Sequence, residues 1–181
     1  MGSAFSTARY HSLSLPRRSP QPYTLASIAR MHATQEREER TMSVFSEAEI
    51  AYLKGQRLGR LATINDAGAP QIAPVGFRYN AELDTIDIGG HGVGASVKYR
   101  NVQSRPIVAF VVDDVVSDAQ APWQPRGVEI RGRAEALATG GKQIRPAFDD
   151  ELIRIHPTRI IGWGIEPDKR RNSRNVGQPG A

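Results

Sequence analysis

Apolar residues recur with a regular period only in the middle of this 181-residue chain. Residues 1–41 are rich in Ser, Arg and Pro and have no apolar period, which predicts a disordered extension. The pattern begins at Met42 and continues to Pro167. Residues 168–181 lack it again, which predicts a disordered basic tail. The sequence therefore predicts one folded domain over residues 42–167.

Within this domain the apolar positions either alternate with polar ones or form short continuous runs, as is typical of β-strands. We expect strands at Leu58–Ile64, Pro70–Tyr79, Thr85–Ile88, Ile107–Val112, Arg126–Leu137, Leu152–Ile155 and Arg159–Ile165. Pro74 cannot donate to a strand ladder, so its strand should lie at an edge or contain a bulge. The nearly continuous apolar run of Ile107–Val112 predicts a strand buried on both faces.

Two short helices are expected, one before the first strand and one between the third and fourth strands. Ser46 and Glu49 have the spacing of a capping box, and Gly55 can end the helix that they begin. Ser96 can cap a second helix, which Arg105-Pro106 ends because the residue before a proline avoids helical backbone. A hairpin-connected sheet of about six strands must close on itself to hide its edges. We therefore expect a mainly β fold, a small antiparallel barrel with short helices.

The net charge of +5 resembles that of a nucleic-acid-binding protein, but its distribution does not. Residues 1–41 hold six Arg against three Glu, and residues 168–181 hold four Lys and Arg against one Asp. The domain between them has a small acidic excess, so we expect no nucleic-acid partner. No apolar run is long enough to span a membrane, and the absence of cysteine is compatible with a cytoplasmic protein.

The strongest chemical signal lies between Thr85 and Val112. A strand is followed by a run of four glycines up to Gly94, then by the Ser96 cap and by Lys98 in the first helical turn. Free amides at a helix start, the helix dipole and a cation all favour a bound phosphate. The alternative is an ordinary turn followed by a solvated lysine.

A dinucleotide site is a weaker interpretation of the same glycines. Gly90 to Ala95 fits the GxGxx(G/A) pattern, and Asp113 follows at about the distance of a ribose-binding acid. The expected helix is short, however, and no further alternation of strands and helices surrounds it. A lysine in the first turn also suits an exposed monoester phosphate better than a pyrophosphate.

No catalytic nucleophile or metal site stands out. His91 and His156 are far apart in the sequence and belong to no HxH or HExxH pattern. The chain has no cysteine and no GxSxG motif. We therefore name no catalytic residue and expect no metal.

Segments along nearly the whole domain resemble a known family. They read GRLATI at Gly59–Ile64, PVGFRYN at Pro74–Asn80, LDTIDIGGH at Leu83–His91, KYRNV at Lys98–Val102, VVDDV at Val111–Val115, RGVEIRGRAEAL at Arg126–Leu137 and IRIHPTRIIGWGIE at Ile153–Glu166. In content and order these segments resemble the split-barrel flavin family typified by pyridoxamine 5'-phosphate oxidase. Within that family they are most similar to the actinobacterial branch that uses the deazaflavin coenzyme F420, in the subgroup of the tetracycline-biosynthesis reductase.

This resemblance implies a six-stranded antiparallel split β-barrel of the FMN-binding type. It also implies a homodimer with one cofactor in each of two grooves at the interface. Lys98 would bind the cofactor phosphate, with help from Ser96 and Arg100.

The resemblance also assigns residues around the cofactor ring. Ala73, Pro74 and Val75 would line the ring through their backbone, and Thr63 would lie beside it. Trp163 of the partner subunit would cover the groove. On their own, the residues leave other interpretations open, since Thr63 could be an ordinary strand threonine and Trp163 part of the barrel core.

One motif departs from the family pattern. Pyridoxamine oxidases carry an Arg-Leu-x-Pro motif near the C-terminus, where this chain has Gly164-Ile165-Glu166-Pro167. This difference argues against pyridoxine phosphate chemistry. The expected reaction is hydride transfer from reduced F420 to a conjugated carbon–carbon double bond of a small organic, including polycyclic, substrate. The alternatives are an FMN-dependent oxidoreductase of the same fold and a non-catalytic flavin- or tetrapyrrole-binding protein.

Overall fold

The computed structural model describes residues 43–116, 123–166 and 171–177. The chain separates into two units, Met1–Met42 and Ser43–Ala181, and the described residues all belong to the second. The extension predicted for residues 1–41 therefore lies outside the described residues. None of the described helices combines the length and the apolar character needed to cross a membrane.

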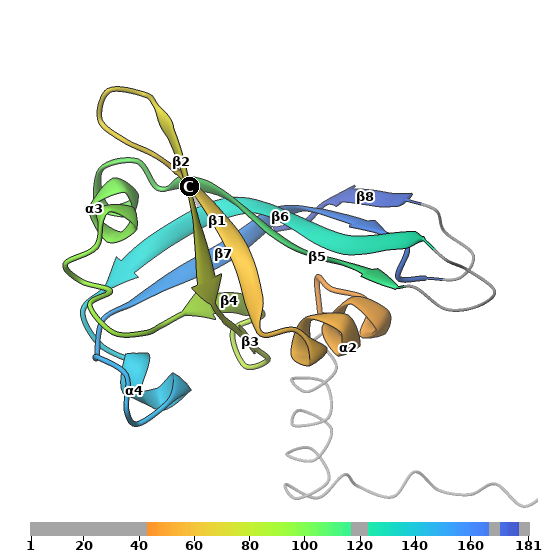
Figure 1. Ribbon diagram of the computed structural model, residues 1–181, viewed down its shortest axis with the longest axis horizontal. Helices are drawn as coiled ribbons and strands as arrows, with labels where there is room; N and C mark the ends of the chain where they lie inside the picture. The colour runs from red at the N-terminus through yellow and green to blue at the C-terminus, as the bar shows by residue number, and fades with distance from the viewer. Residues whose placement is uncertain (1–42, 117–122, 167–170, 178–181) are drawn as a thin grey trace, which may run out of the picture. The chain divides into compact units, whose positions relative to one another are not determined.

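The described residues form one antiparallel sheet of eight strands (Figure 1). The strands are β1 (Leu58–Ile64), β2 (Pro70–Gly76), β3 (Arg78–Asn80), β4 (Thr85–Ile88), β5 (Ile107–Val116), β6 (Gln124–Leu137), β7 (Leu152–Trp163) and β8 (Arg171–Asn175). Their order is β2-β1-β5-β6-β7-β4-β3, and β8 also pairs with β7. The mainly β, antiparallel fold predicted from the sequence is confirmed.

The sheet curls into a split barrel because of one short connection. β2 and β3 lie at opposite ends of the hydrogen-bonded order, yet only Phe77 separates them in the chain. The two ends of the sheet must therefore approach each other without pairing. Phe77 packs edge-on against Phe110 at 5.1 Å between ring centroids, so the chain turns where this ring enters the core. This turn divides the single strand predicted for Pro70–Tyr79.

The described residues also form three short helices. They are α2 (Glu47–Gly55), α3 (Val97–Ser104) and α4 (Gly141–Ile144). The capping box is present, since Ser46 Oγ accepts the Glu49 amide and the Glu49 carboxylate accepts the Ser46 amide. Ser96 caps α3, and Arg105 follows its last turn, as predicted. Helix α4 lies in a segment between two predicted strands, where no helix was expected from the sequence.

The core lies inside the curl of the sheet. Its fully buried side chains come from every central strand and include Leu61, Ile86, Phe110, Ile130 and Ile160. Leu53 of α2 and Val102 of α3 are buried in the same cluster, so both helices pack against it. Burial of this apolar surface is the main stabilising contribution to the domain.

The two strands predicted for Leu152–Ile155 and Arg159–Ile165 are one strand, β7. His156 and Pro157 stay in the ladder because β6 and β7 shift register at Arg131/Gly132. Gly132 permits this bulge, since a Cβ there would lie 2.1 Å from the carbonyl oxygen of His156. The Pro157 nitrogen carries no hydrogen and cannot donate to the ladder. The bulge accommodates it within an otherwise continuous pair of strands.

The prediction that residues 168–181 are wholly disordered is wrong for Arg171–Asn175. These residues form β8, which pairs with the C-terminal half of β7. Arg174 explains this strand, because its guanidinium binds the Glu49 carboxylate and the Val44 carbonyl. The basic composition of this segment predicted disorder because the sequence does not show that Arg174 pairs with the buried Glu49.

The prediction that Ile107–Val112 is buried on both faces is also wrong within one chain. Burial alternates along β5, and the Ile107 side chain is 60% exposed. On the same outer face lie Ala109 and Val111, followed by Ala62 of β1 and Ile72 of β2. We call these five residues the apolar face.

Candidate functional site

The start of α3 is built as the sequence predicted. Ser96 Oγ accepts the Tyr99 amide at 3.3 Å and donates to the Val93 carbonyl at 2.6 Å. The first turn contains no acidic residue. The backbone amides of Val97 and Lys98 have no acceptor in the described part of the chain, because a first turn lacks preceding carbonyls. This end of α3 can therefore donate hydrogen bonds to an anion.

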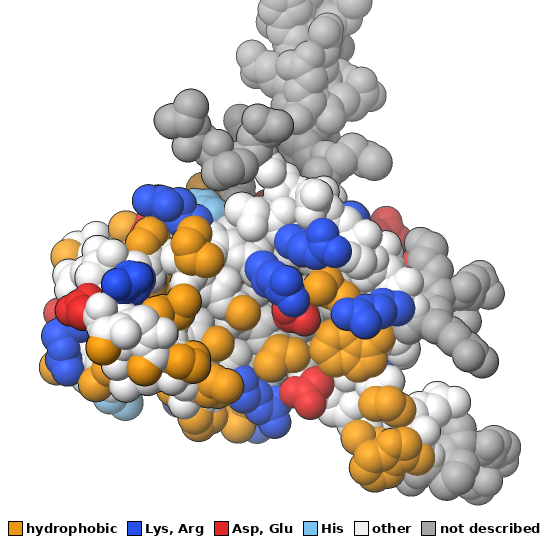
Figure 2. Space-filling model, turned by 90° about the horizontal axis from the view of Figure 1, so that it is seen from above, with side chains coloured by type: hydrophobic (Ala, Val, Ile, Leu, Met, Phe, Trp, Pro, Cys, Tyr) orange, Lys and Arg blue, Asp and Glu red, His pale blue; other side chains and the backbone are white. Residues whose placement is uncertain are grey.

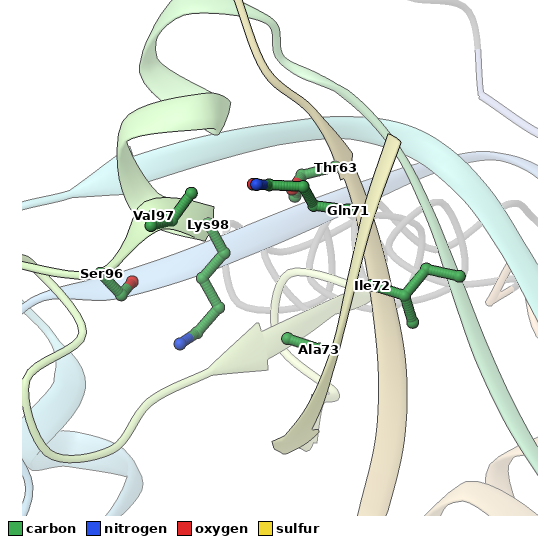
Figure 3. A pocket seen from close by; sticks show the side chains of 7 residues that line it. All are labelled: Thr63, Gln71, Ile72, Ala73, Ser96, Val97 and Lys98. Carbon is green, nitrogen blue, oxygen red and sulfur yellow. The ribbon is translucent and has the colours of Figure 1, made fainter. Parts of the chain in front are cut away.

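A pocket of about 370 Å³ lies between this helix start and the β1–β2 hairpin (Figure 3). Thr63, Gln71, Ile72, Ala73, Ser96, Val97 and Lys98 line it. β2 is the last strand of the sheet order, so its outer backbone groups have no strand partner among the described residues. The pocket therefore has a helix start on one side and a sheet edge on the other.

Lys98 is the cation of this pocket. Its half-buried side chain extends from the first turn of α3 into the space facing Ala73 on β2 (Figure 3). In the part of the chain that the structure describes, Lys98 makes no hydrogen bond and no ion pair. Its ammonium group thus remains available to bind an anion in the pocket.

The polar side chains on the inner wall of the pocket, Thr63 and Gln71, are both held by a buried asparagine. Asn101 is 6% exposed, and its Nδ2 donates to Thr63 Oγ1 at 3.0 Å and to Gln71 Oε1 at 2.8 Å. The Thr63 side chain is also buried, with 2% exposure. This network joins α3 to β1 and β2 and fixes the side chains of that wall.

The structure brings together four of the residues assigned from the sequence: Thr63, Ala73, Ser96 and Lys98. Arg100 does not line the pocket, since its Nη1 donates to the Ala95 carbonyl at 2.7 Å. This guanidinium is held by the loop before its own helix.

Pro74, Val75 and Trp163 also do not line the pocket. The Val75 side chain lies in the core with 6% exposure, and Pro74 is exposed. Trp163 lies with Glu49 and Gly162 near α2. The assignment of Trp163 to the groove of a partner subunit stays a prediction.

Sequence reasoning missed Gln71, Ile72, Val97 and Asn101. Gln71 and Ile72 could have been found from the Asn65–Ala69 turn. This turn fixes the antiparallel register, in which Thr63 pairs with Gln71 and Ala62 with Ile72. Asn101 follows Lys98 by three positions and so lies on the same side of the helix. A polar residue at a buried helix position was the observable hint.

Lys and Arg side chains elsewhere on the domain are spread among apolar ones. Figure 2 shows this mixture on one face of the molecule. Several of these cations are paired, such as Arg60 with Asp113 and Arg131 with Glu129. Asp113, the candidate ribose-binding acid, therefore pairs with a strand arginine and does not line the pocket.

Known proteins are similar to this chain, either in sequence or in fold. A curated relative, the 5a,11a-dehydrotetracycline/5a,11a-dehydrooxytetracycline reductase of Streptomyces rimosus, is 50% identical over 124 residues, or 68% of this chain and 86% of that protein. A heme binding protein from Mycobacterium smegmatis superposes with a TM-score of 0.53 at 18% identity, covering 72% of this chain and 58% of that one.

A conserved hypothetical protein from Mycobacterium tuberculosis superposes with a TM-score of 0.52 at 22% identity, covering 78% of this chain and 99% of that one. At such identities these two likenesses show the fold alone. The family model described as pyridoxamine 5'-phosphate oxidase matches residues 45–164. By this match and by the half-identical reductase, the chain belongs to the pyridoxamine 5'-phosphate oxidase family.

Proposed function

We propose that this protein is a coenzyme F420-dependent reductase, which transfers hydride to a conjugated carbon–carbon double bond of a small polycyclic substrate. The family and the relative's name support an oxidoreductase of this fold. The observation that carries the proposal is the unpaired Lys98 at the capped start of α3, inside a pocket open to a sheet edge. The "dehydro" in the relative's name denotes a double bond in a polycyclic compound, which suggests the substrate class.

The residues of the pocket suit a phosphate-bearing flavin-type coenzyme. Lys98 and the free amides of α3 would hold the phosphate, since charge-assisted hydrogen bonds are the stronger kind. Ile72 and Ala73 offer an apolar surface for a flat ring, and Thr63 and Gln71 offer hydrogen bonds. Such a pocket combines one charged end with a mixed apolar and polar wall.

The coenzyme supplies the hydride when it is bound. The chain's own contribution is to hold the phosphate at Lys98 and to orient the ring against the edge of β2. Backbone groups near Ala73, Pro74 and Val75 lie at this edge and can contact a ring without using their side chains. No residue is assigned as the proton donor.

We also propose that the protein works as a homodimer joined through the apolar face. The first six residues of β5, Ile107–Val112, are apolar on both sides, as expected for a strand segment that a second copy covers. Ile72 belongs to the apolar face and also lines the pocket, so a partner bound there would border the coenzyme. In this arrangement Trp163 of the partner subunit would close the groove.

Replacing Ile107 with Glu should convert the dimer into monomers, because a buried unpaired carboxylate is costly at an interface. Ile107 lines neither the coenzyme pocket nor the neighbouring hollow on the apolar face. Light scattering at micromolar concentration checks the result. Leu83→Glu is the control, since Leu83 is 52% exposed in a turn away from this face. A wild-type monomer with coenzyme present would contradict the dimer.

Titration of the purified protein with F420 and FMN tests the choice of coenzyme. We expect F420 to bind at least tenfold more tightly, a difference of about 1.4 kcal/mol. Equal or reversed affinities would favour the FMN-dependent alternative. Oxidation of reduced F420 on addition of a polycyclic enone then tests the reaction, and tight binding without turnover would favour the non-catalytic alternative.

A further inference from the structure

Asn101 controls which hydrogen-bonding atoms the pocket wall presents. Its two Nδ2 hydrogens are directed to Thr63 Oγ1 and Gln71 Oε1, so both of these oxygens act as acceptors toward the helix. Asn101 itself does not line the pocket, whereas Thr63 and Gln71 do. Any effect of Asn101 on a ligand would therefore act through these two side chains.

Both side chains can still donate hydrogen bonds to a ligand. A threonine hydroxyl that accepts a hydrogen bond still has its own O–H, and a glutamine whose oxygen is engaged still has its NH₂ group. Neither donor has an acceptor among the described residues. Each of the two oxygens keeps one lone pair, but together with the Lys98 ammonium the polar side chains of this pocket offer mainly hydrogens.

We propose that Asn101 is a positioning residue that sets the pocket to select a ligand edge whose polar atoms are mainly hydrogen-bond acceptors. The carbonyl oxygens of a flavin-type ring and the oxygens of a phosphate both have this chemistry. The identity of the ligand rests on the proposed function, but the direction of the hydrogen bonds rests only on the Thr63–Asn101–Gln71 contacts.

A double-mutant cycle tests whether Asn101 acts through Gln71. Asn101→Leu and Gln71→Met should each weaken F420 binding by about tenfold, since each removes or releases one donor. The double variant should bind about as weakly as one single variant, because the same donor is already lost. Losses that multiply to about one hundredfold would show independent effects and overturn the proposal.

Asn101→Asp separates a directional role from a merely structural one. Aspartate has the same shape but only accepts, so Thr63 and Gln71 would turn their hydrogens toward it and away from the ligand. We therefore expect Asn101→Asp to bind F420 more weakly than Asn101→Leu. A structural role predicts the reverse, because the isosteric change disturbs packing less. Gln103→Glu, on the exposed side of α3, controls for the added charge.

Two simpler probes locate the ligand edge. If the wall faces the ring, Asn101→Asp should weaken the binding of a phosphate-free deazaflavin. If the wall faces the phosphate, Asn101→Asp should weaken the binding of inorganic phosphate more than Gln103→Glu does. No change with either probe would overturn the proposal. Normal F420 binding by Lys98→Ala would instead contradict the phosphate site of the proposed function, without touching the Asn101 result.

Discussion

Arg174→Ala should lower the free energy of unfolding by about 3 kcal/mol, the lower end of the cost of breaking a buried ion pair. The Glu49 side chain is 2% exposed and that of Arg174 27%, so the variant would leave a carboxylate buried without its cation. The hydrogen bond to Glu49 raises the pKa of Arg174 above its ordinary value, as expected for a charged pair. Denaturant unfolding measures the change.

Arg159→Ala is the matched control. Arg159 also reaches β8, through Asn175 and Ser173, but it is only half-buried, its hydrogen bonds are exposed and its partners are neutral. Its removal should change stability by less than about 0.5 kcal/mol. Adding Glu49→Gln to Arg174→Ala should restore part of the loss, because it neutralises the stranded charge and keeps an acceptor for Ser46. Equal stabilities of the two arginine variants would show that Arg174 does not anchor β8.

Lys98→Ala should weaken F420 binding by about tenfold to 150-fold, since hydrogen bonds to charged groups contribute roughly 1.5–3 kcal/mol. The Ser96 cap and the free amides of α3 would remain, so binding should fall without vanishing. Stability without coenzyme should change little, because Lys98 has no partner among the described residues. Isothermal titration gives the affinity, and thermal unfolding gives the stability.

Lys142→Ala is the control for lost positive charge, since Lys142 is exposed on α4 and does not line the pocket. A coenzyme analogue without the phosphate should bind wild type and Lys98→Ala alike, because the lost contact is the same one. Unchanged binding of the intact coenzyme by Lys98→Ala would mean that this lysine is an ordinary solvated residue.

Local features of the domain could be predicted from the sequence, because neighbouring residues determine them. The capping box of Ser46 and Glu49 and the Ser96 cap depend on contacts across three residues. The edge position of β2 follows from Pro74, which lacks an amide hydrogen. The helix-start site with Lys98 was visible for the same reason, since cap and cation lie within one turn.

Features that depend on residues far apart in the chain were decided by the tertiary structure. Asn101 meets Thr63 and Gln71 across 38 and 30 positions, and Arg174 meets Glu49 across 125. Neither pairing leaves a local pattern in the sequence. Asn101 could therefore be taken for an ordinary helix residue, and the basic tail for a disordered one. The sequence alone determined the capped start of α3 and its lysine, where we propose that an anion binds, because a helix cap is local. Only the tertiary structure decided what surrounds this helix start and that the tail contributes a strand. The curl of the sheet brings distant polar groups together, and burial requires them to pair.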